Sequence, residues 1–374
     1  MNELAHYSRQ SISEEDIGAV SEVMRSDFLT TGPTVPLFEE ALKNYLGARN
    51  VVAVSSGTAA LHLTILAAGV GPGDEVIVPA LTFVATANVV LAVGATPVFA
   101  DCTDPHDGWI STLIPALNPH LVTDKTKAVM SVDFAGDHVW SDSGYRWPEI
   151  DGGDGRWITV IYDSAHSLGA DRTWHSPSTF SFHPVKSITT AEGGAVVMDN
   201  DEWATAIRQM RNHGRDENGL MVRLGFNYRM SDMQAALGIS QLKRIDKFIA
   251  KRRALSCAYR DLIKGLNVPV ELPAIDYERS ACHLFPVLVP RSRNVDLRND
   301  VVKQMRDRGI GVGIHYWPIV PLHPFYVEKY HHRAEDFPVA FDISARIMSL
   351  PLHVGLTMQD VEKVVDTLKV VLER

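Results

Sequence analysis

Short apolar runs alternate with amphipathic segments along the first half of the chain. The runs are rich in valine, alanine and isoleucine and contain few charged residues. Such runs are typical of strands that are buried on both faces of a sheet. Because helical patterns lie between them, we predict an α/β fold with a mostly parallel, seven-stranded sheet and helices on both faces. The predicted strands are 51–54, 75–79, 96–102, 127–136, 157–162, 178–182 and 193–198.

The amphipathic segments carry signals for helix starts. Residues 13–25 begin with a serine followed by three acidic residues, and Ser231 precedes a long helical region. Serine at this position caps the free backbone N–H groups of a first helical turn. Further helices are predicted to open at 55–58 and to span 35–47, 83–93, 111–117 and 199–214. Residues 137–156 are rich in Gly, Asp and Trp and are interpreted as a surface loop.

The pattern changes near residue 246. From there the chain contains a predicted strand at 283–290, a helix at 295–309, a strand at 310–320 that runs into a loop, and a closing helix at 356–373. We therefore predict two domains, a large one at 1–245 and a smaller α+β domain at 246–374.

Composition excludes several functional classes. The chain has 374 residues and a formal net charge of −9, which disfavours a nucleic-acid-binding protein. Its three cysteines lie far apart and indicate neither disulfides nor a zinc site. The polar N-terminal residues lack an apolar signal core, so we expect a cytoplasmic protein. No metal site is predicted, because the adjacent histidines at 331–332 do not share a helix face.

Two stretches could suggest other partners. Residues 76–100 contain no Asp, Glu, Lys or Arg, but Pro79, Gly94 and Pro97 interrupt them, so a buried strand–helix–strand unit is preferred to a membrane span. The basic cluster at 243–253 is interpreted as one solvated or interfacial helix face and not as a nucleic-acid site.

The segment 157–198 carries the candidate chemistry. Asp163 follows a buried strand, and Lys186 lies in a Ser/Thr-rich loop between two further strands. Ligands of such sheets gather at the carboxyl ends of the strands. A lysine that forms an imine and an acid that pairs with a pyridine nitrogen are what a protein supplies to pyridoxal phosphate (PLP). Either residue alone has a simpler interpretation, as a surface lysine or a helix-capping aspartate.

The segment Ser55–Ser56–Gly57–Thr58 is a candidate anion site. It follows a short strand and opens a helix, whose first turn offers free N–H groups and the positive end of the helix dipole. An ordinary serine cap explains the same residues equally well. No GxGxxG follows the first strand, so a dinucleotide fingerprint is missing.

Several motifs together resemble the DegT/DnrJ/EryC1/StrS family of sugar aminotransferases. The likeness runs almost from end to end and includes TTGPTVPLFEEAL, SSGTAALHL, PALTFVAT, YDSAHSLGA, SFHPVKSITTAEGG, FNYRMSDMQAALG and GIGVGIHYWPI. The resemblance implies a fold-type-I PLP-dependent transferase. It points most closely to the branch that aminates C4 of UDP-linked 4-keto-6-deoxy amino sugars, the pseudaminic-acid type. The bacillosamine, perosamine and 4-amino-arabinose branches are near alternatives.

The resemblance also implies roles for individual residues. Lys186 would hold PLP covalently, Asp163 would pair with its ring nitrogen, and His166 would lie beside the ring oxygen. Phe83 would stack on the ring. The phosphate would bind to Gly57, Thr58, Ser181 and, from the partner subunit of a homodimer with shared active sites, Asn227. Residues expected near the substrate are Thr31, Arg229, His315 and Tyr316.

The implied reaction transfers an amino group from L-glutamate to a nucleotide-linked keto sugar during amino-sugar biosynthesis for surface glycans. Two alternatives remain on the same scaffold, a PLP-dependent sugar dehydratase and a non-catalytic regulatory protein. The dehydratases commonly carry histidine in place of the lysine, whereas this chain has Lys186. Residues 137–156, the short 171–177 segment and Trp317 depart from the family pattern, which leaves the identity of the sugar open.

Overall fold

A computed structural model describes residues 5–102, 119–137, 157–171, 177–292 and 296–373. Within these residues, seven strands form one sheet in the order β1-β7-β6-β5-β4-β2-β3. Only β7 runs antiparallel to its neighbours β1 and β6, which confirms the predicted mostly parallel sheet. The strands are β1 Asn50–Val54, β2 Glu75–Pro79, β3 Thr96–Ala100, β4 Thr126–Val132, β5 Thr159–Asp163, β6 Ser178–Ser181 and β7 Gly194–Met198.

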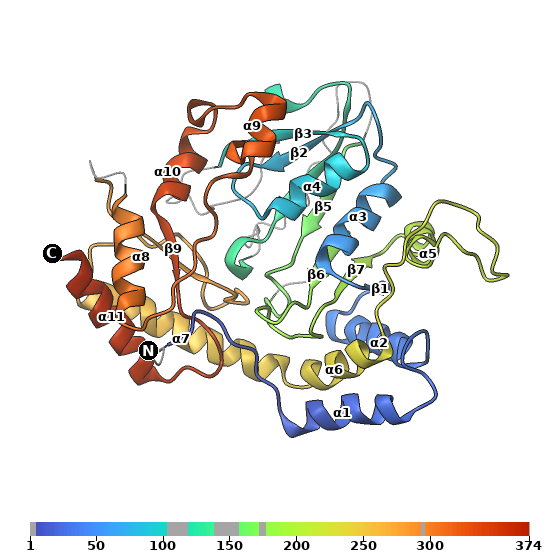
Figure 1. Ribbon diagram of the computed structural model, residues 1–374, viewed down its shortest axis with the longest axis horizontal. Coiled ribbons are helices and arrows are strands. Elements are labelled where there is room, and N and C mark those ends of the chain that lie inside the picture. Colours follow the sequence, from blue (N-terminus) through green and yellow to red (C-terminus); the bar gives the residue numbers. More distant parts are fainter. Residues whose placement is uncertain (1–4, 103–118, 138–156, 172–176, 293–295, 374) are drawn as a thin grey trace.

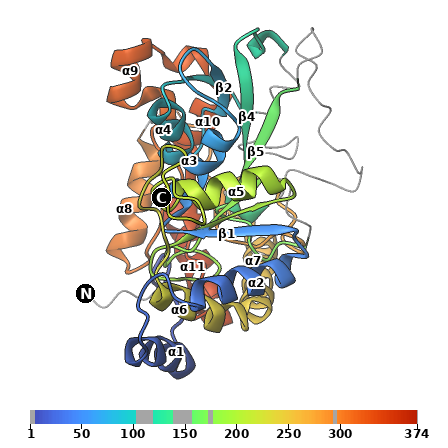
Figure 2. The same ribbon diagram turned by 90° about the vertical axis from the view of Figure 1, so that its right-hand side faces the viewer.

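Helices cover both faces of this sheet (Figures 1 and 2). On one face lie α3 (Gly57–Ala67), α4 (Val84–Ala92) and α5 (Asp201–Met210), and on the other lies α2 (Thr34–Leu46). Figure 2 shows β1 between α5 and α2. The helix α6 (Asp232–Leu242) packs on α2, and α1 (Glu14–Arg25) packs on α6. The strands are almost completely buried between these layers, as their apolar composition predicts.

The helix starts follow the predicted capping signals. Ser13 and Ser231 each form a capping box, in which the serine side chain accepts from the N3 backbone and the N3 side chain accepts from the cap backbone. The long helical region after Ser231 divides at Lys243 and Arg244, and α7 (Ile245–Gly265) continues from there. The helix predicted at 199–214 ends earlier, at Met210, because the following backbone pairs with residues 226–228.

The C-terminal part contains the two-stranded antiparallel sheet of β8 (Phe285–Leu288) and β9 (Ile347–Leu350). Its helices are α8 (Leu297–Asp307), α9 (Pro324–Tyr330), α10 (Pro338–Arg346) and α11 (Met358–Leu372), and α11 packs against both α7 and α8 (Figure 1). Short 3-10 helices occur at Pro119–Leu121, Phe134–Gly136, Val320–Leu322 and Ala334–Asp336. The domain boundary at 245/246 stays a prediction.

The prediction of a strand at 310–320 is wrong. Within the described residues this segment makes only isolated bridges, from Ile310 to Ala5 and from Gly313 to Ser349. Gly311, Gly313 and Pro318 weaken an extended ladder, and the chain instead bends so that His315 and Tyr316 reach a cavity. The helix predicted at 111–117 lies outside the described residues, as does all but the first residue of the loop predicted at 137–156.

The loop between β6 and β7 is closed at its base. The backbone N–H of Phe182 donates to Gly193 O (2.9 Å), and that of Thr190 donates to Phe182 O (3.0 Å). Lys186 lies at the middle of this loop. In the described part of the chain, no helix is both long and apolar enough to span a bilayer.

Candidate active site

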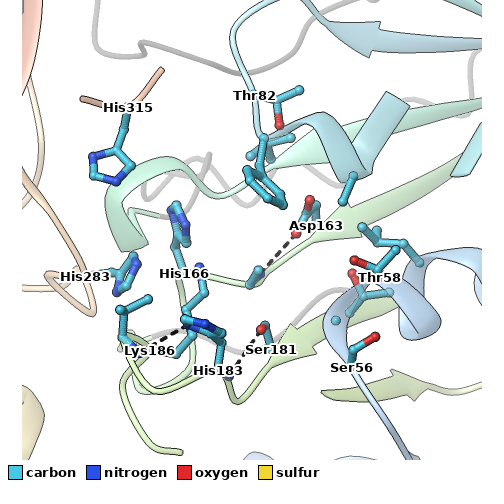
Figure 3. Close-up of a pocket in the computed structure, with 18 of the residues that line it drawn as sticks. Ser56, Thr58, Thr82, Asp163, His166, Ser181, His183, Lys186, His283 and His315 are labelled. Carbon is cyan, nitrogen blue, oxygen red and sulfur yellow. Dashed lines mark hydrogen bonds between the residues drawn. The ribbon is translucent and has the colours of Figure 1, made fainter. Parts of the chain in front are cut away.

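A cavity of about 450 Å³ lies where the β5 end, the α3 start, the residues before α4, and the β6–β7 loop meet (Figure 3). Its volume falls within the range of about 300–1,000 Å³ that is usual for small-molecule sites. His315 and Tyr316 from the C-terminal part and Tyr7 from the N-terminal segment complete its lining. Segments from the whole chain therefore converge on one site.

Asp163 is the last residue of β5 and is buried, with 7% of its surface exposed. Its Oδ2 accepts a hydrogen bond of 2.8 Å from the Thr86 hydroxyl, and Oδ1 accepts one of 3.3 Å from the Ala165 N–H. Burial raises the pKa of the Asp163 carboxyl, whereas these two bonds and the charge of Lys186 oppose that increase. The carboxylate is thus buried at the end of a strand, in the same cavity as the amine of Lys186.

Lys186 lines the same cavity from the β6–β7 loop. Burial of its amine lowers the pKa from the ordinary value of 10.5 to about 8, and Asp163 opposes this shift. An amine with this pKa is partly unprotonated near neutral pH, so it can act as a nucleophile and as a base.

The start of α3 forms an anion site beside Ser181. The Ser56 hydroxyl accepts from the Ala59 N–H (3.1 Å), while the N–H groups of Gly57 and Thr58 meet no acceptor among the described residues. A Cβ on Gly57 would lie 2.8 Å from the Ser181 Cβ, so only glycine permits this approach of helix and strand. Free N–H groups and a hydroxyl at a helix start suit a phosphate.

Aromatic and imidazole side chains form another wall. The rings of His166 and His283 lie 4.2 Å apart, and burial holds the pKa of both imidazoles well below 6.5. The Tyr316 hydroxyl lies 3.5 Å from His166 Nε2. His315 is fixed on both sides, by the Tyr7 hydroxyl at Nε2 (3.0 Å) and by the Ser349 hydroxyl at Nδ1 (2.9 Å). These rings are neutral at neutral pH.

The residues of this cavity fit PLP. Figure 3 shows Ser56 and Thr58 at one end, Lys186 and His283 toward the other, and Asp163 and His166 between them. The cavity therefore offers an anion site for a phosphate, an acid for a pyridine nitrogen and an amine for an aldehyde.

The structure brings nine of the twelve predicted site residues together. These are Gly57, Thr58, Phe83, Asp163, His166, Ser181, Lys186, His315 and Tyr316. The other three do not line the cavity of this chain. Thr31 is exposed with a φ of 57°, Asn227 is exposed, and Arg229 donates to Asn212 Oδ1 (2.8 Å).

Several cavity residues carry no prediction from the sequence. Tyr7, Thr82, His183, Glu192 and His283 line the cavity, and Thr86 binds Asp163 behind it. Thr82 lies just before α4 and Thr86 lies in its first turn, and their hydroxyls meet at 3.0 Å. Nothing in the local pattern around Tyr7 or His283 indicates a site, because each reaches the cavity only through the tertiary fold.

A sheet of this order, with a lysine on a loop and an acid at a strand end facing one anion site, defines a PLP-dependent transferase of fold type I. Residues 10–369 match the DegT/DnrJ/EryC1/StrS aminotransferase family, and the chain belongs to that family. It is therefore a PLP-dependent aminotransferase, and the prediction of its class is confirmed.

Individual relatives agree with this assignment. The chain is 34% identical over 388 residues to UDP-4-amino-4-deoxy-L-arabinose–oxoglutarate aminotransferase of Shewanella sediminis (strain HAW-EB3), covering 97% of each chain. Its fold matches PseC of Helicobacter pylori, an aminotransferase of pseudaminic acid biosynthesis, with a TM-score of 0.86, 30% identity and 99% of each chain covered. The PLP form of Spr1654 of Streptococcus pneumoniae, assigned as a sugar aminotransferase, matches with a TM-score of 0.86, 28% identity and 98% of each chain covered.

Proposed function

We propose that this enzyme transfers the amino group of L-glutamate to a nucleotide-linked keto sugar, at C4 of a UDP-4-keto-6-deoxy amino sugar. The observation that carries the chemistry is the presence of Lys186 and Asp163 in one cavity beside the anion site of α3. The sugar substrate is supported by the relatives, whose names include a UDP-linked 4-amino sugar and pseudaminic acid.

In the proposed reaction, PLP supplies an electron sink for the carbon from which a proton is removed. Lys186 would hold the cofactor, and its amine, with a pKa of about 8, would take the proton from the α-carbon of the donor and return it during the transfer. Asp163 keeps a proton on the pyridine nitrogen. The same residues perform the reverse steps on the keto sugar, so ping-pong kinetics are expected.

The remaining roles concern binding. Phe83 would pack against the cofactor ring, His166 would contact the ring oxygen, and Gly57, Thr58 and Ser181 would bind the phosphate. Phe83 is 55% exposed and lies 6.0 Å from the Tyr316 ring, so one face of Phe83 is available to a planar ligand. His315 and Tyr316 would face the sugar.

A homodimer would complete the site. Within the described part of the chain no arginine lines the cavity, although a nucleotide sugar carries two phosphate charges. The segment 215–229 carries three arginines and Asn227, and its Leu220, Met221 and Leu224 are exposed. Large exposed apolar side chains that lie together mark an interaction surface. In the proposed dimer, Asn227 and Arg229 reach the cavity of the partner subunit, Thr31 lies at its entrance, and the enzyme works in the cytoplasm.

The test is a panel of nucleotide keto sugars incubated with L-glutamate, with products identified by mass and NMR. We expect an amino sugar, 2-oxoglutarate and a visible absorption band that borohydride removes. Lys186→Ala should abolish turnover, whereas the variant Lys43→Ala should not, because Lys43 pairs with Glu40 on α2 and does not line the cavity. A deoxygenated product without nitrogen would instead show a dehydratase, and a protein that PLP cannot colour would exclude the proposal.

A further inference from the structure

Thr86 lies in the first turn of α4, and its side chain is completely buried. Threonine hydroxyls inside helices usually donate to the carbonyl four residues earlier. Thr64 in α3 follows this rule, since its Oγ1 donates to Ala60 O at 2.8 Å. Thr86 departs from it, because its Oγ1 leaves the helix and donates to Asp163 Oδ2 on β5, also at 2.8 Å. The hydroxyl of Thr86 therefore donates its hydrogen bond to the acid of the active site and not to a carbonyl of its own helix.

The carboxylate of Asp163 fixes the direction of the hydrogen bonds of both threonines. A hydroxyl has one proton, and an ionised carboxylate can only accept. Because the Thr86 proton is directed to Asp163, the Thr86 oxygen must accept from the Thr82 hydroxyl, which lies 3.0 Å away. Thr82 is 1% exposed and lines the cavity, where Figure 3 shows it on the same side as Asp163. The two threonines therefore form a relay of two hydrogen bonds, from Thr82 to Thr86 and from Thr86 to the carboxylate of Asp163.

The ionisation of Asp163 depends on these two hydrogen bonds, because few other groups oppose the increase in its pKa that burial causes. Among the groups that lower the pKa of Asp163, the Thr86 hydroxyl contributes most, followed by the Ala165 N–H and the charge of Lys186. The Ala165 bond is longer, at 3.3 Å, and the Asp133 carboxylate acts in the opposite direction. The partly buried Tyr316, whose own pKa is raised, also interacts electrostatically with Asp163.

We propose that Thr86 is a positioning residue whose hydroxyl, oriented by Thr82, keeps Asp163 ionised and aimed at the cofactor site. This inference rests on the proposed function, in which Asp163 holds the pyridine nitrogen of PLP. Neither threonine needs to touch the substrate or the cofactor. Their effect passes through the protonation and the orientation of Asp163.

The experiment measures Asp163 directly in the PLP-free protein. Carboxyl-labelled aspartate is followed by carbon NMR across pH, and the Asp163→Asn variant identifies the signal. Loss of a hydrogen bond to a charged group should raise the pKa of Asp163 by about 1 to 2 units in Thr86→Val. Thr86→Ser keeps the hydroxyl and should restore the wild-type titration. Thr82→Val should raise the pKa by a smaller amount.

Thr64→Val is the matched control, since Thr64 is also completely buried in a helix but bonds within that helix. It should leave the titration of Asp163 unchanged. An unchanged titration in Thr86→Val and Thr82→Val would overturn the proposal. So would an equal shift in Thr64→Val, because the effect would then be a general one of losing a buried hydroxyl.

A second measurement follows the PLP dissociation constant. At a pH below the Asp163 pKa of both proteins, as the titration gives it, we expect Thr86→Val to bind PLP about 10-fold more weakly for each unit of the shift, with Thr86→Ser near wild type, because the ionised fraction of Asp163 falls by that factor. The experiment distinguishes failure of the proposed function from failure of the inference about Thr86. If Asp163→Asn binds PLP and turns over like wild type, the role of Asp163 is wrong, whereas the NMR titration still decides whether Thr86 controls that carboxylate.

Discussion

The carboxylate of Asp232 accepts a 2.7 Å hydrogen bond from the backbone N–H of Gly32, which lies 200 residues earlier in the chain. The same carboxylate also accepts from the N–H groups of Thr34 (2.7 Å) and Val35 (3.2 Å). The N-cap residue of α2 is Pro33, which makes no side-chain cap. Asp232, at the start of α6, therefore caps α2 from another helix and fixes the turn that contains Thr31.

The first prediction concerns this cap. Asp232 is completely buried, so Asp232→Ala would leave three backbone N–H groups without an acceptor. We expect the free energy of unfolding to fall by about 3 kcal/mol, measured by urea denaturation. Asp246→Ala is the control, because Asp246 is exposed and accepts only from the Tyr45 hydroxyl. Equal effects of the two variants would contradict this role of Asp232.

The second prediction concerns the phosphate site. In Gly57→Ala the new Cβ would meet the Ser181 Cβ at 2.8 Å, so the first turn of α3 and the end of β6 must separate. We expect the affinity for PLP to fall by about 10-fold, because the free N–H groups and the Ser181 hydroxyl would no longer converge. The measurement is PLP titration of the PLP-free protein.

Gly18→Ala provides the matched control for that substitution. Gly18 lies inside α1, and a Cβ there has no atom within 4 Å. Alanine should stabilise this helix by about 0.5–1 kcal/mol and leave PLP affinity unchanged. An unchanged PLP affinity in Gly57→Ala would show that the α3 start does not hold the phosphate.

The third prediction concerns Lys186 and pH. Burial lowers the pKa of its amine from 10.5 to about 8, so the unfolded chain binds more protons than the folded chain between these values. The stability of the PLP-free protein therefore rises with pH across that window as far as this group is concerned. Lys186→Met removes a charge whose partial burial in the cavity is unfavourable. It should stabilise the PLP-free protein by up to about 3 kcal/mol at pH 7 and by nothing above pH 10.5.

Unfolding curves at pH 7, 9 and 10.5 test this dependence. Lys125→Met serves as the control, since Lys125 is exposed. A stabilisation by Lys186→Met that does not change with pH would reflect added apolar packing alone and would contradict the predicted linkage.

The fourth prediction concerns the proposed shared site. Lys186→Ala and Asn227→Asp should each be inactive. Lys186→Ala lacks the amine, and the new carboxylate of Asn227→Asp repels the phosphate. In a mixed dimer, one site would carry both substitutions and the other would carry neither. Refolding an equal mixture should recover about one quarter of wild-type activity, since half the dimers are mixed and each has one intact site. A mixture that stays inactive would place Asn227 in the same site as the Lys186 of its own chain.

Much of the architecture is predictable from sequence because strong local signals agree with the tertiary fold. The valine-rich runs became the strands of the sheet, and Ser13 and Ser231 became caps as their patterns indicate. The segment 310–320 was misjudged because its apolar residues suit a strand, whereas its glycines and Pro318 allow the bend that the cavity requires.

Some residues of the candidate site are likewise predictable from the sequence, and others are not. Asp163 and Gly57 lie at element ends and Lys186 lies in a polar loop between two strands, so the pattern alone marks them as candidates. Tyr7 and His315 meet across 308 residues, and no local pattern reports such a contact. Thr86 was missed for a different reason, because a threonine inside a helix gives no sign of whether its hydroxyl bonds inward or across to a strand.

The antiparallel direction of β7 has a consequence for how the enzyme takes up its cofactor. Since β6 and β7 pair directly at Ser181 and Gly194, the loop that carries Lys186 is tied at its base and has a fixed reach. The amine of Lys186 therefore stays at the wall of the cavity. We expect pyridoxal phosphate to reach the lysine through the mouth of the cavity, without unfolding of the chain.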